Sequence, residues 1–386
     1  MRKFYTAEAV TEGHPDKLCD QIADAILDVC LKQDEQSRVA CEVLATKGTI
    51  IVAGEITSTY EPDVFAVVRK VLSDIGYSSE GIAMDTFVHQ QSPDIAGAVD
   101  TSKERREGVS DNQMDWFQGA GDQGVMIGYA CDETKQLMPI PVVLANRIVR
   151  ELSACRQSSY IQGILPDGKA QVTVEYENGK PVRLDSVVVS CQHTEDKNLK
   201  KLEAEIRKKV LLPALRLLPP DEDTKIFINP SGRFVCGGMD ADTGLTGRKL
   251  MVDSYGSMVP HGGGAFSGKD CSKVDRSVAY MARYIAKNIV AARLASRCQV
   301  SLAYAIGVAQ PVMVQVDTFG TGKVCADDCL ELAIPLVFGL TPKQIVDSLR
   351  LTRPIFRQTA AFGHFGRKEF PWERTDKVEA LRNAVI

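Results

Sequence analysis

The chain has 386 residues, of which 44% are hydrophobic and 25% are charged, a composition typical of a globular protein with two or three domains. Its net charge of −4 and isoelectric point near 5.9 argue against nucleic acid as the main partner, because a surface that binds the phosphate backbone is normally basic. No apolar run is long enough to span a membrane, and no signal peptide is recognisable. Eleven cysteines without a CxxC spacing indicate reduced thiols, so we expect a cytoplasmic location.

The first third of the chain predicts a helix, two strands and a second helix. Apolar residues in 18–29 recur with helical spacing, and Pro15 suits a first helical turn. Strand-like runs follow at residues 38–45 and 49–58. A second helix is expected over residues 62–75.

The same order of elements returns in the middle of the chain. A helix is expected over residues 142–155, and strands lie within 171–191. Asn178-Gly179 predicts a tight hairpin turn between these strands. A charged helix follows over residues 198–215.

The order appears a third time towards the C-terminus. It comprises a helix over residues 273–294, strands at 298–307 and 312–320, and a helix from Ala326. These three rounds predict an α+β fold of three similar domains. The strands alternate, so each sheet packs one face on its helices and needs a partner for the other face, from another domain or subunit.

The predicted domain boundaries follow this order. Residues 98–118 are highly charged and poor in apolar residues, which indicates a mobile loop, either a lid over a site or a solvated linker. The predicted ranges are 1–97, 119–231 and 232–372 for the domains, 98–118 for the loop, and 373–386 for a tail.

Two short motifs in the first half combine charge with glycine. EGHPDK places His14, Asp16 and Lys17 at the start of a helix, where an anion is favoured and a carboxylate suits phosphate-bound Mg²⁺. A capping histidine and a first-turn acid would look the same. GAGDQG allows close backbone approach to a ligand, although an ordinary turn would fit it equally.

A richer segment, NPSGRFVCGGMDADTGLTGRK, begins at Asn229. Its DADTG resembles the start of a calcium loop, but Gly244 falls one place early and the closing glutamate is missing, so an EF-hand is unsuited. Arg233, Asp240 and Asp242 stand in the same glycine-dense frame, followed by the basic pair of GLTGRK.

The segment HGGGAFSGKDCSK nearly matches a Walker A phosphate loop, but Asp270 stands where the motif needs Ser or Thr. The preceding residues make a poor buried strand, so we reject a P-loop. Asp16 and Asp275 would carry Mg²⁺ in place of the missing hydroxyl. We predict a phosphate clamp of point charges formed by Arg248, Lys249, Lys269 and Lys273.

With these motifs in place, the sequence resembles bacterial-type S-adenosylmethionine synthetases over about residues 4–375. GAGDQG and GGGAFSGKD are the two signature motifs of that family, and EGHPDK, QSPDI, GLTGRK, SKVDRS, YAIG and AAFGHFGR stand in the family's order. The resemblance implies three α+β domains with pseudo-threefold symmetry. It also implies a homodimer whose active sites lie between subunits, often paired into a tetramer, with no nucleic acid or membrane as partner.

The implied reaction is attack of the L-methionine sulfur on C5′ of ATP, followed by hydrolysis of the released tripolyphosphate. Two Mg²⁺ ions per site and K⁺ are the implied cofactors. The resemblance implies catalytic roles for His14, Asp122, Lys169, Arg248 and Lys269. It implies ATP contacts from His14, Asp167, Gly168, Lys169, Ser231, Arg233, Phe234, Asp242, Arg248, Lys249, Ala265 and Lys269. It implies methionine contacts from Glu55, Gln91, Asp122, Asp242 and Lys273, Mg²⁺ ligation by Asp16 and Asp275, and K⁺ ligation by Glu42.

One departure from the family pattern leaves a choice open. GGMDAD replaces the usual GGP followed by a small residue and an aspartate, so Asp240 competes with Asp242, and the count back from GLTGRK supports Asp242. Three other hypotheses compete with the synthetase: a P-loop NTPase or kinase, a regulatory protein with a dead nucleotide site, and a plain α+β oligomer with solvated charges.

Overall fold

The computed structural model of the protein describes residues 2–92, 101–108 and 118–385. Its strands are β1 (Arg2–Val10), β2 (Arg38–Thr46), β3 (Thr49–Thr57), β4 (Ala83–His89), β5 (Gly124–Cys131), β6 (Ile164–Glu177), β7 (Lys180–His193), β8 (Lys225–Ile228), β9 (Gly244–Leu245), β10 (Arg297–Tyr304) and β11 (Met313–Asp317). Its α-helices are α1 (Pro15–Gln33), α2 (Val64–Ile75), α4 (Lys103–Arg106), α5 (Ile140–Gln157), α6 (Leu199–Ile206), α7 (Leu212–Ala214), α8 (Leu250–Asp253), α9 (Val274–Ala291), α10 (Asp327–Val337), α11 (Pro342–Leu349) and α12 (Val378–Ala384).

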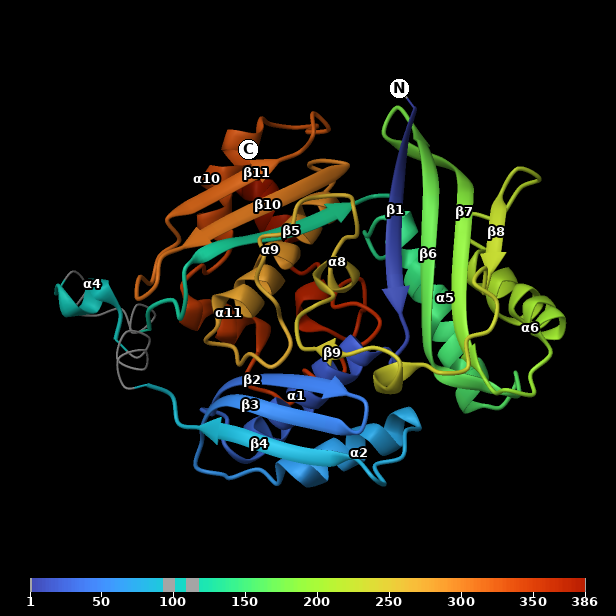
Figure 1. Ribbon diagram of the computed structural model, residues 1–386. Helices are drawn as coiled ribbons and strands as arrows, with labels where there is room; N and C mark the ends of the chain where they lie inside the picture. Colours follow the sequence, from blue (N-terminus) through green and yellow to red (C-terminus); the bar gives the residue numbers. More distant parts are fainter. Residues whose placement is uncertain (1, 93–100, 109–117, 386) are drawn as a thin grey trace.

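These strands form three sheets, with the orders β1-β6-β7-β8, β11-β10-β5 and β4-β3-β2-β9. Helix α5 packs on β6 and β1, α1 packs on β2, and α9 packs on β5 and β10, so each sheet has a helix-covered face (Figure 1). The predicted α+β class is therefore confirmed, with three sheets in one chain.

Local signals set several element boundaries as the sequence predicted. The Asp63 side chain accepts a hydrogen bond from the Ala66 N–H at 2.9 Å and caps α2, and Gly76 ends that helix with φ 101°. The hairpin between β6 and β7 turns at Asn178 and Gly179, with φ of 50° and 77°. Positive φ at both positions is what a two-residue primed turn requires.

The structure adds strands that the element order did not predict. β1 pairs with β6, β5 pairs with β10, and β9 pairs with β2. Each sheet therefore takes a strand from outside the sequence range predicted for its domain. The extra strands were not predicted because pairing between distant segments leaves no local pattern in the sequence. The predicted domain ranges stay a prediction.

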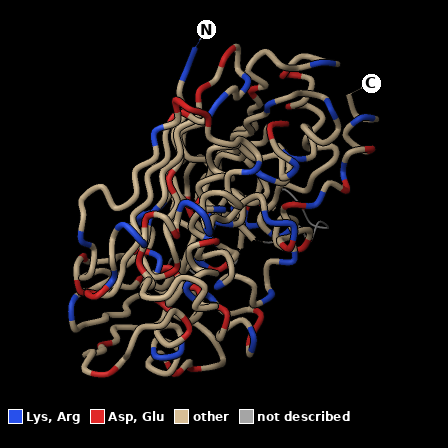
Figure 2. The backbone as a smooth tube through the Cα atoms, turned by 90° about the vertical axis from the view of Figure 1, so that its right-hand side faces the viewer, with Lys and Arg blue, Asp and Glu red and all other residues tan. Residues whose placement is uncertain are grey.

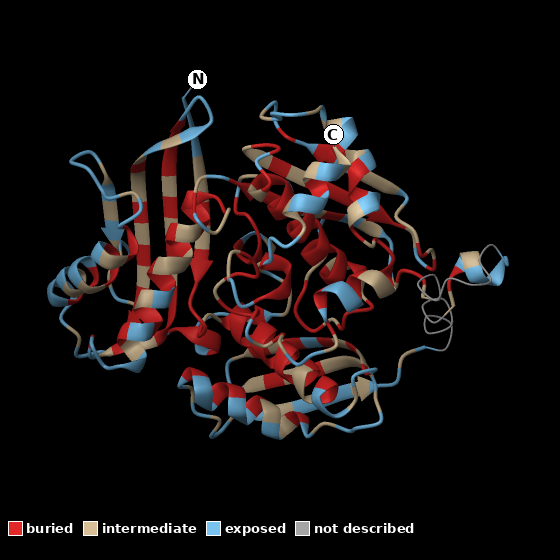
Figure 3. Cartoon of the chain, turned by 180° about the vertical axis from the view of Figure 1, so that it is seen from behind, coloured by how far each residue is buried: buried red, intermediate tan, exposed pale blue. Residues whose placement is uncertain are grey.

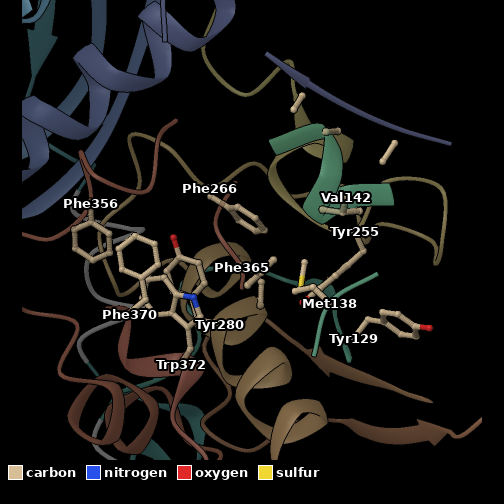
Figure 4. Close-up of a cluster of buried hydrophobic side chains, with 14 of the residues drawn as sticks. Tyr129, Met138, Val142, Tyr255, Phe266, Tyr280, Phe356, Phe365, Phe370 and Trp372 are labelled. Carbon is tan, nitrogen blue, oxygen red and sulfur yellow. The ribbon is translucent and has the colours of Figure 1, made fainter. Parts of the chain in front are cut away.

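The core lies where the helical layers of the three sheets meet, as the buried residues in Figure 3 show. One part of it is an aromatic cluster (Figure 4). Trp372 is fully buried, with its ring stacked 3.7 Å from Tyr280 and 4.9 Å from Phe370, measured between centroids. This cluster fixes the segment after residue 350 against α9.

The predicted lid at 98–118 falls largely outside the described residues. Within 101–108, the N–H of Lys103 donates to the Gly307 carbonyl at 2.8 Å, and Glu104 accepts from the Ala309 N–H at 2.9 Å. Whether the whole loop acts as a lid stays a prediction. Within the described ranges no single helix could cross a membrane; only α10 and α11 together have the length and composition, and they are bent by 76°.

Trp372→Ala should lower the thermal stability strongly. Truncating a buried tryptophan leaves a cavity and typically costs about 3–5 kcal/mol. Differential scanning calorimetry should show a clear fall in Tm, whereas Tyr160→Ala, at a side chain that is 60% exposed, should leave Tm nearly unchanged. Equal shifts in the two variants would contradict this assignment of the core.

Candidate active site

Two charged loops lie along the same edge of β2. β9 pairs there through Leu44 and Leu245, and further along the edge the N–H of Cys41 donates to the Gly268 carbonyl at 2.9 Å. Between the two, Ala265 lies against Gly247. Segments 244–249 and 265–273 are therefore neighbours, and together they hold all four residues of the predicted phosphate clamp.

The glycines of the second loop allow close packing against the rest of the chain. A Cβ on Gly268, whose φ is 82°, would lie 2.0 Å from the Cys41 carbonyl oxygen, and one on Gly264 would lie 2.2 Å from the Asp275 side chain. Residues 254–273, all of them described, contain no strand, and α9 begins only at Val274. The loop is not a Walker A loop, because that motif lies between a strand and a helix.

His14 stands at the N-terminal end of α1, in a group of side chains that we call the His14 group: His14, Asp16, Asp167, Lys169, Asp242, Arg248 and Lys249. Its Nδ1 accepts a hydrogen bond from the Asp16 N–H at 3.2 Å, which leaves Nε2 as the proton-bearing nitrogen of the neutral ring. Burial, followed by the charge of Lys249, lowers the pKa of His14 to about 4. His14 is therefore a neutral hydrogen-bond donor near pH 7.

Asp16 joins α1 to the first charged loop. Its carboxylate contacts the Lys249 ammonium, accepts from the Leu245 N–H at 3.0 Å and lies 3.8 Å from the Arg248 guanidinium. Burial opposes ionisation, but the hydrogen bonds from Lys249 and Leu245 outweigh it, so the pKa of Asp16 lies below its ordinary value. The carboxylate is thus ionised and available to a cation.

The central sheet contributes two further members of the His14 group. Asp167 accepts from the Gly238 N–H at 2.8 Å, and its pKa is raised mainly by burial. Lys169 pairs with Glu8 on the neighbouring strand at 2.8 Å. Sequence reasoning missed Glu8, because only the pairing of β1 with β6 brings it to the site. Asp242 lies close enough to influence the pKa values of His14 and Asp167, and Asp240 lies close enough to influence that of Tyr77. The choice of Asp242 over Asp240 stays a prediction.

The second charged loop belongs to a separate set, which we call the Lys269 group: Glu42, Glu55, Lys269, Lys273 and Asp275. Lys269 pairs with Asp275 at 2.6 Å, and Lys273 pairs with the buried Asp270 at 2.5 Å. Desolvation, only partly offset by Lys269, raises the pKa of Glu42, although its side chain reaches the surface. Figure 2 shows this close mixing of opposite charges throughout the chain.

The remaining predicted contacts are more open. Glu55 pairs with the exposed His89 at 3.2 Å, and the N–H of Gln91 donates to Thr57 at 3.2 Å. Asp122 is exposed and accepts from the Gln123 N–H at 2.7 Å. Ser231, Arg233 and Phe234 follow β8, where Arg233 pairs with the exposed Glu195 and the Phe234 N–H donates to His193. The structure does not bring these side chains into direct contact with the clamp.

The carboxylates suit hard cations. Asp16 and Asp275 each pair with an ammonium group. Each carboxylate therefore already stabilises a positive charge at its position. Among the described residues there is no cluster of three or more metal-binding side chains. A single carboxylate per ion fits Mg²⁺ that is held mainly by phosphate oxygens and water. Glu42 offers one carboxylate oxygen donor for a larger cation.

Lysines and an arginine on two adjoining loops, together with His14 and Asp16 at the start of α1, make an arrangement suited to binding a polyanion. Comparison with known proteins makes this specific. Residues 2–100, 117–234 and 236–374 match the N-terminal, central and C-terminal domains of S-adenosylmethionine synthetase. The chain is 51% identical to the S-adenosylmethionine synthase of Treponema denticola, over 99% of this chain and 98% of that protein.

The chain belongs to the S-adenosylmethionine synthetase family. It is a methionine adenosyltransferase (EC 2.5.1.6), a transferase that makes S-adenosylmethionine from methionine and ATP. The family resemblance that the sequence motifs indicated is confirmed.

The pKa of His14 gives a direct test of this site. Long-range ¹H–¹⁵N spectra of the ligand-free protein, assigned with His14→Asn, should show the ring titrating near 4 rather than 6.5. Lys249→Met should raise that pKa, because a nearby positive charge is removed. Since the folded-state value lies below the unfolded one, His14 should also reduce stability as the pH falls from 6.5 towards 4. An unshifted pKa near 6.5 in the wild type would contradict this account.

Proposed function

We propose that adenosyl transfer takes place where the His14 group of one chain faces the Lys269 group of a partner chain in a homodimer, with dimers pairing into tetramers in the cytoplasm. The observation that carries this proposal is the symmetrical pairing of the two candidate Mg²⁺ carboxylates with clamp lysines. Asp16 contacts Lys249 in one group, and Asp275 pairs with Lys269 in the other. Each group therefore contains one candidate Mg²⁺ carboxylate paired with one clamp lysine, and the proposed site combines the two pairs around the triphosphate.

The exposed faces of the sheets support a paired assembly. Phe87 on β4 is 63% exposed, Phe227 on β8 is 46% exposed and Leu245 on β9 is 37% exposed. Large apolar side chains on uncovered sheet faces are typical of surfaces that a second subunit buries. A second chain on these faces would also bring a second set of charged loops near the first.

ATP binding exchanges the partners of these charges. Lys249 and Lys269 would turn from Asp16 and Asp275 to phosphate oxygens, and these two carboxylates would then hold the two Mg²⁺ ions. When bound, Mg²⁺ neutralises charge on the triphosphate as it leaves. Glu42 supplies a ligand for K⁺. Phosphate contacts come from Lys169, Arg248, Lys249 and Lys269, and adenosine contacts come from Ser231, Arg233 and Phe234. Further ATP contacts come from Asp167, Gly168, Asp242 and Ala265.

The chemical step needs no general base, because the methionine sulfur is a neutral thioether. Glu55, Gln91, Asp122, Asp242 and Lys273 place methionine so that its sulfur is in line with C5′ of ATP. Bond formation from sulfur to C5′ breaks the bond from C5′ to the triphosphate oxygen. His14 donates its Nε2 proton as a hydrogen bond to the leaving triphosphate, which is then hydrolysed to pyrophosphate and phosphate.

Lys269→Ala should lower turnover far more than methionine affinity. A donor that gains strength as charge moves onto the leaving group contributes on the order of 10²–10³ in rate. Steady-state assays of S-adenosylmethionine formation should show this fall in kcat, with a small change in the KM for methionine. Lys368→Ala, at an exposed position outside both charged loops, serves as the control. An unchanged kcat in Lys269→Ala would remove the clamp from the mechanism.

The shared site is tested by mixing two inactive variants. His14→Ala and Lys269→Ala chains, co-expressed with different tags, should regain about a quarter of wild-type activity, because random pairing in a two-fold dimer leaves one intact site in each mixed dimer. The purified mixed dimer should carry all of that activity. No recovery, in mixed dimers that form normally, would place the two groups in a site within one chain.

A further inference from the structure

Helix α1 carries an aspartate at every fourth position: Asp16, Asp20, Asp24 and Asp28. This spacing places the four carboxylates on one face of the helix, about one turn apart. Like charges in that arrangement normally destabilise a helix, and Asp20 and Asp24 are both fully buried. Such an arrangement persists only where each carboxylate has partners.

Each aspartate accepts hydrogen bonds from the backbone of a segment more than 200 residues away. Asp20 accepts from the Gly247 N–H at 2.9 Å, and Asp24 accepts from the Gly268 N–H at 2.8 Å. Asp28 accepts at 2.9 Å from the N–H groups of Phe356 and Arg357. The side chains of one helix therefore anchor both charged loops and one loop that carries no clamp residue.

Asp24 holds the second charged loop most firmly. It pairs with the buried Arg276 through two hydrogen bonds of 2.6 and 2.8 Å. Arg276 also donates to the carbonyl of Lys269 at 3.1 Å. The Gly268 N–H and the Lys269 carbonyl are thus bound by two side chains that bind each other, so the backbone of Lys269 is fixed on both sides.

Asp20 holds the first charged loop in a similar way. Its carboxylate pairs with the buried Lys17 ammonium at 2.9 Å, and Lys17 also contacts Asp253. Asp20 binds the N–H of Gly247, the residue immediately before Arg248 and Lys249. Both loops are therefore held by carboxyl groups that are buried inside the protein.

We propose that Asp20 and Asp24 are positioning residues for the reaction, which set the backbone under Arg248, Lys249 and Lys269 so that these side chains meet the triphosphate. The inference rests on the clamp role proposed above. Small displacements of a charged donor lower the rate steeply, since stabilisation of the leaving group depends on preorganised geometry. Of the proposed methionine contacts, only Lys273 lies on one of the two loops, and its ammonium is held by Asp270. We therefore expect methionine binding to change much less than kcat.

The test compares Asp20→Asn, Asp24→Asn and Asp28→Asn. Asparagine keeps an acceptor oxygen but removes the charge in all three, so each variant should lose some thermal stability. Asp20→Asn and Asp24→Asn should lower kcat at least tenfold at a temperature well below Tm, with the KM for methionine within about threefold. Asp28→Asn should keep kcat within about twofold. Equal kcat values in the three variants would overturn the inference.

A double-mutant cycle separates positioning from damage to the fold. If Asp24 acts through Lys269, then Asp24→Asn/Lys269→Ala should be no slower than Lys269→Ala alone, because coupled residues are not additive. If the fold-loss in kcat of the double variant equals the product of the losses in the two single variants, the inference is overturned. If Asp24→Asn does not fold, the cycle of Asp20→Asn with Lys249→Met applies the same criterion to the other loop.

The same data distinguish the inference from the function on which it rests. A normal kcat in Lys269→Ala would reject the clamp itself. A slow Lys269→Ala together with an additive Asp24→Asn would reject only the positioning role.

Discussion

The structure depends on the burial of carboxyl groups along one face of α1. Carboxylates can be buried only where each has hydrogen-bond donors and a balancing charge. Lys17 and Arg276 supply the charge, and backbone N–H groups of distant loops supply the donors. The need to satisfy these buried carboxyl groups links the helix and the loops. Loop N–H groups donate hydrogen bonds to the aspartates of α1, and the same hydrogen bonds hold the backbone of the loops in place.

This constraint explains how the ligand-free protein keeps its reactive charges in place. Asp16 pairs with Lys249, and Asp275 pairs with Lys269, so each carboxylate neutralises a neighbouring lysine. Preformed pairs of this kind avoid electrostatic repulsion among the clamp cations. Under the proposed mechanism, these pairs would let a triphosphate take over the lysines without rebuilding the site.

Much of the fold could be predicted from local patterns. The stripe in 18–29 gave α1, and Asn178-Gly179 gave the hairpin, since both signals depend on neighbouring residues. The strands missed were β1, β4, β5, β8 and β9. Of these, β1, β5 and β9 join sheets built from distant segments, and β9 has only two residues. Pairing of this kind leaves no periodic signal, which is also why Glu8 beside Lys169 was not foreseen.

The sequence by itself determined the family and the activity, because motifs such as GAGDQG, GGGAFSGKD and GLTGRK combine residue types whose chemistry and spacing are specific. It also held the aspartate repeat of α1, but spacing alone could not separate a solvated acidic face from a buried one. Only the tertiary structure decided that these carboxylates are internal and that residues 244–249 and 265–273 share the edge of β2. Burial depends on what packs against a helix, and that contact is made by segments more than 200 residues away.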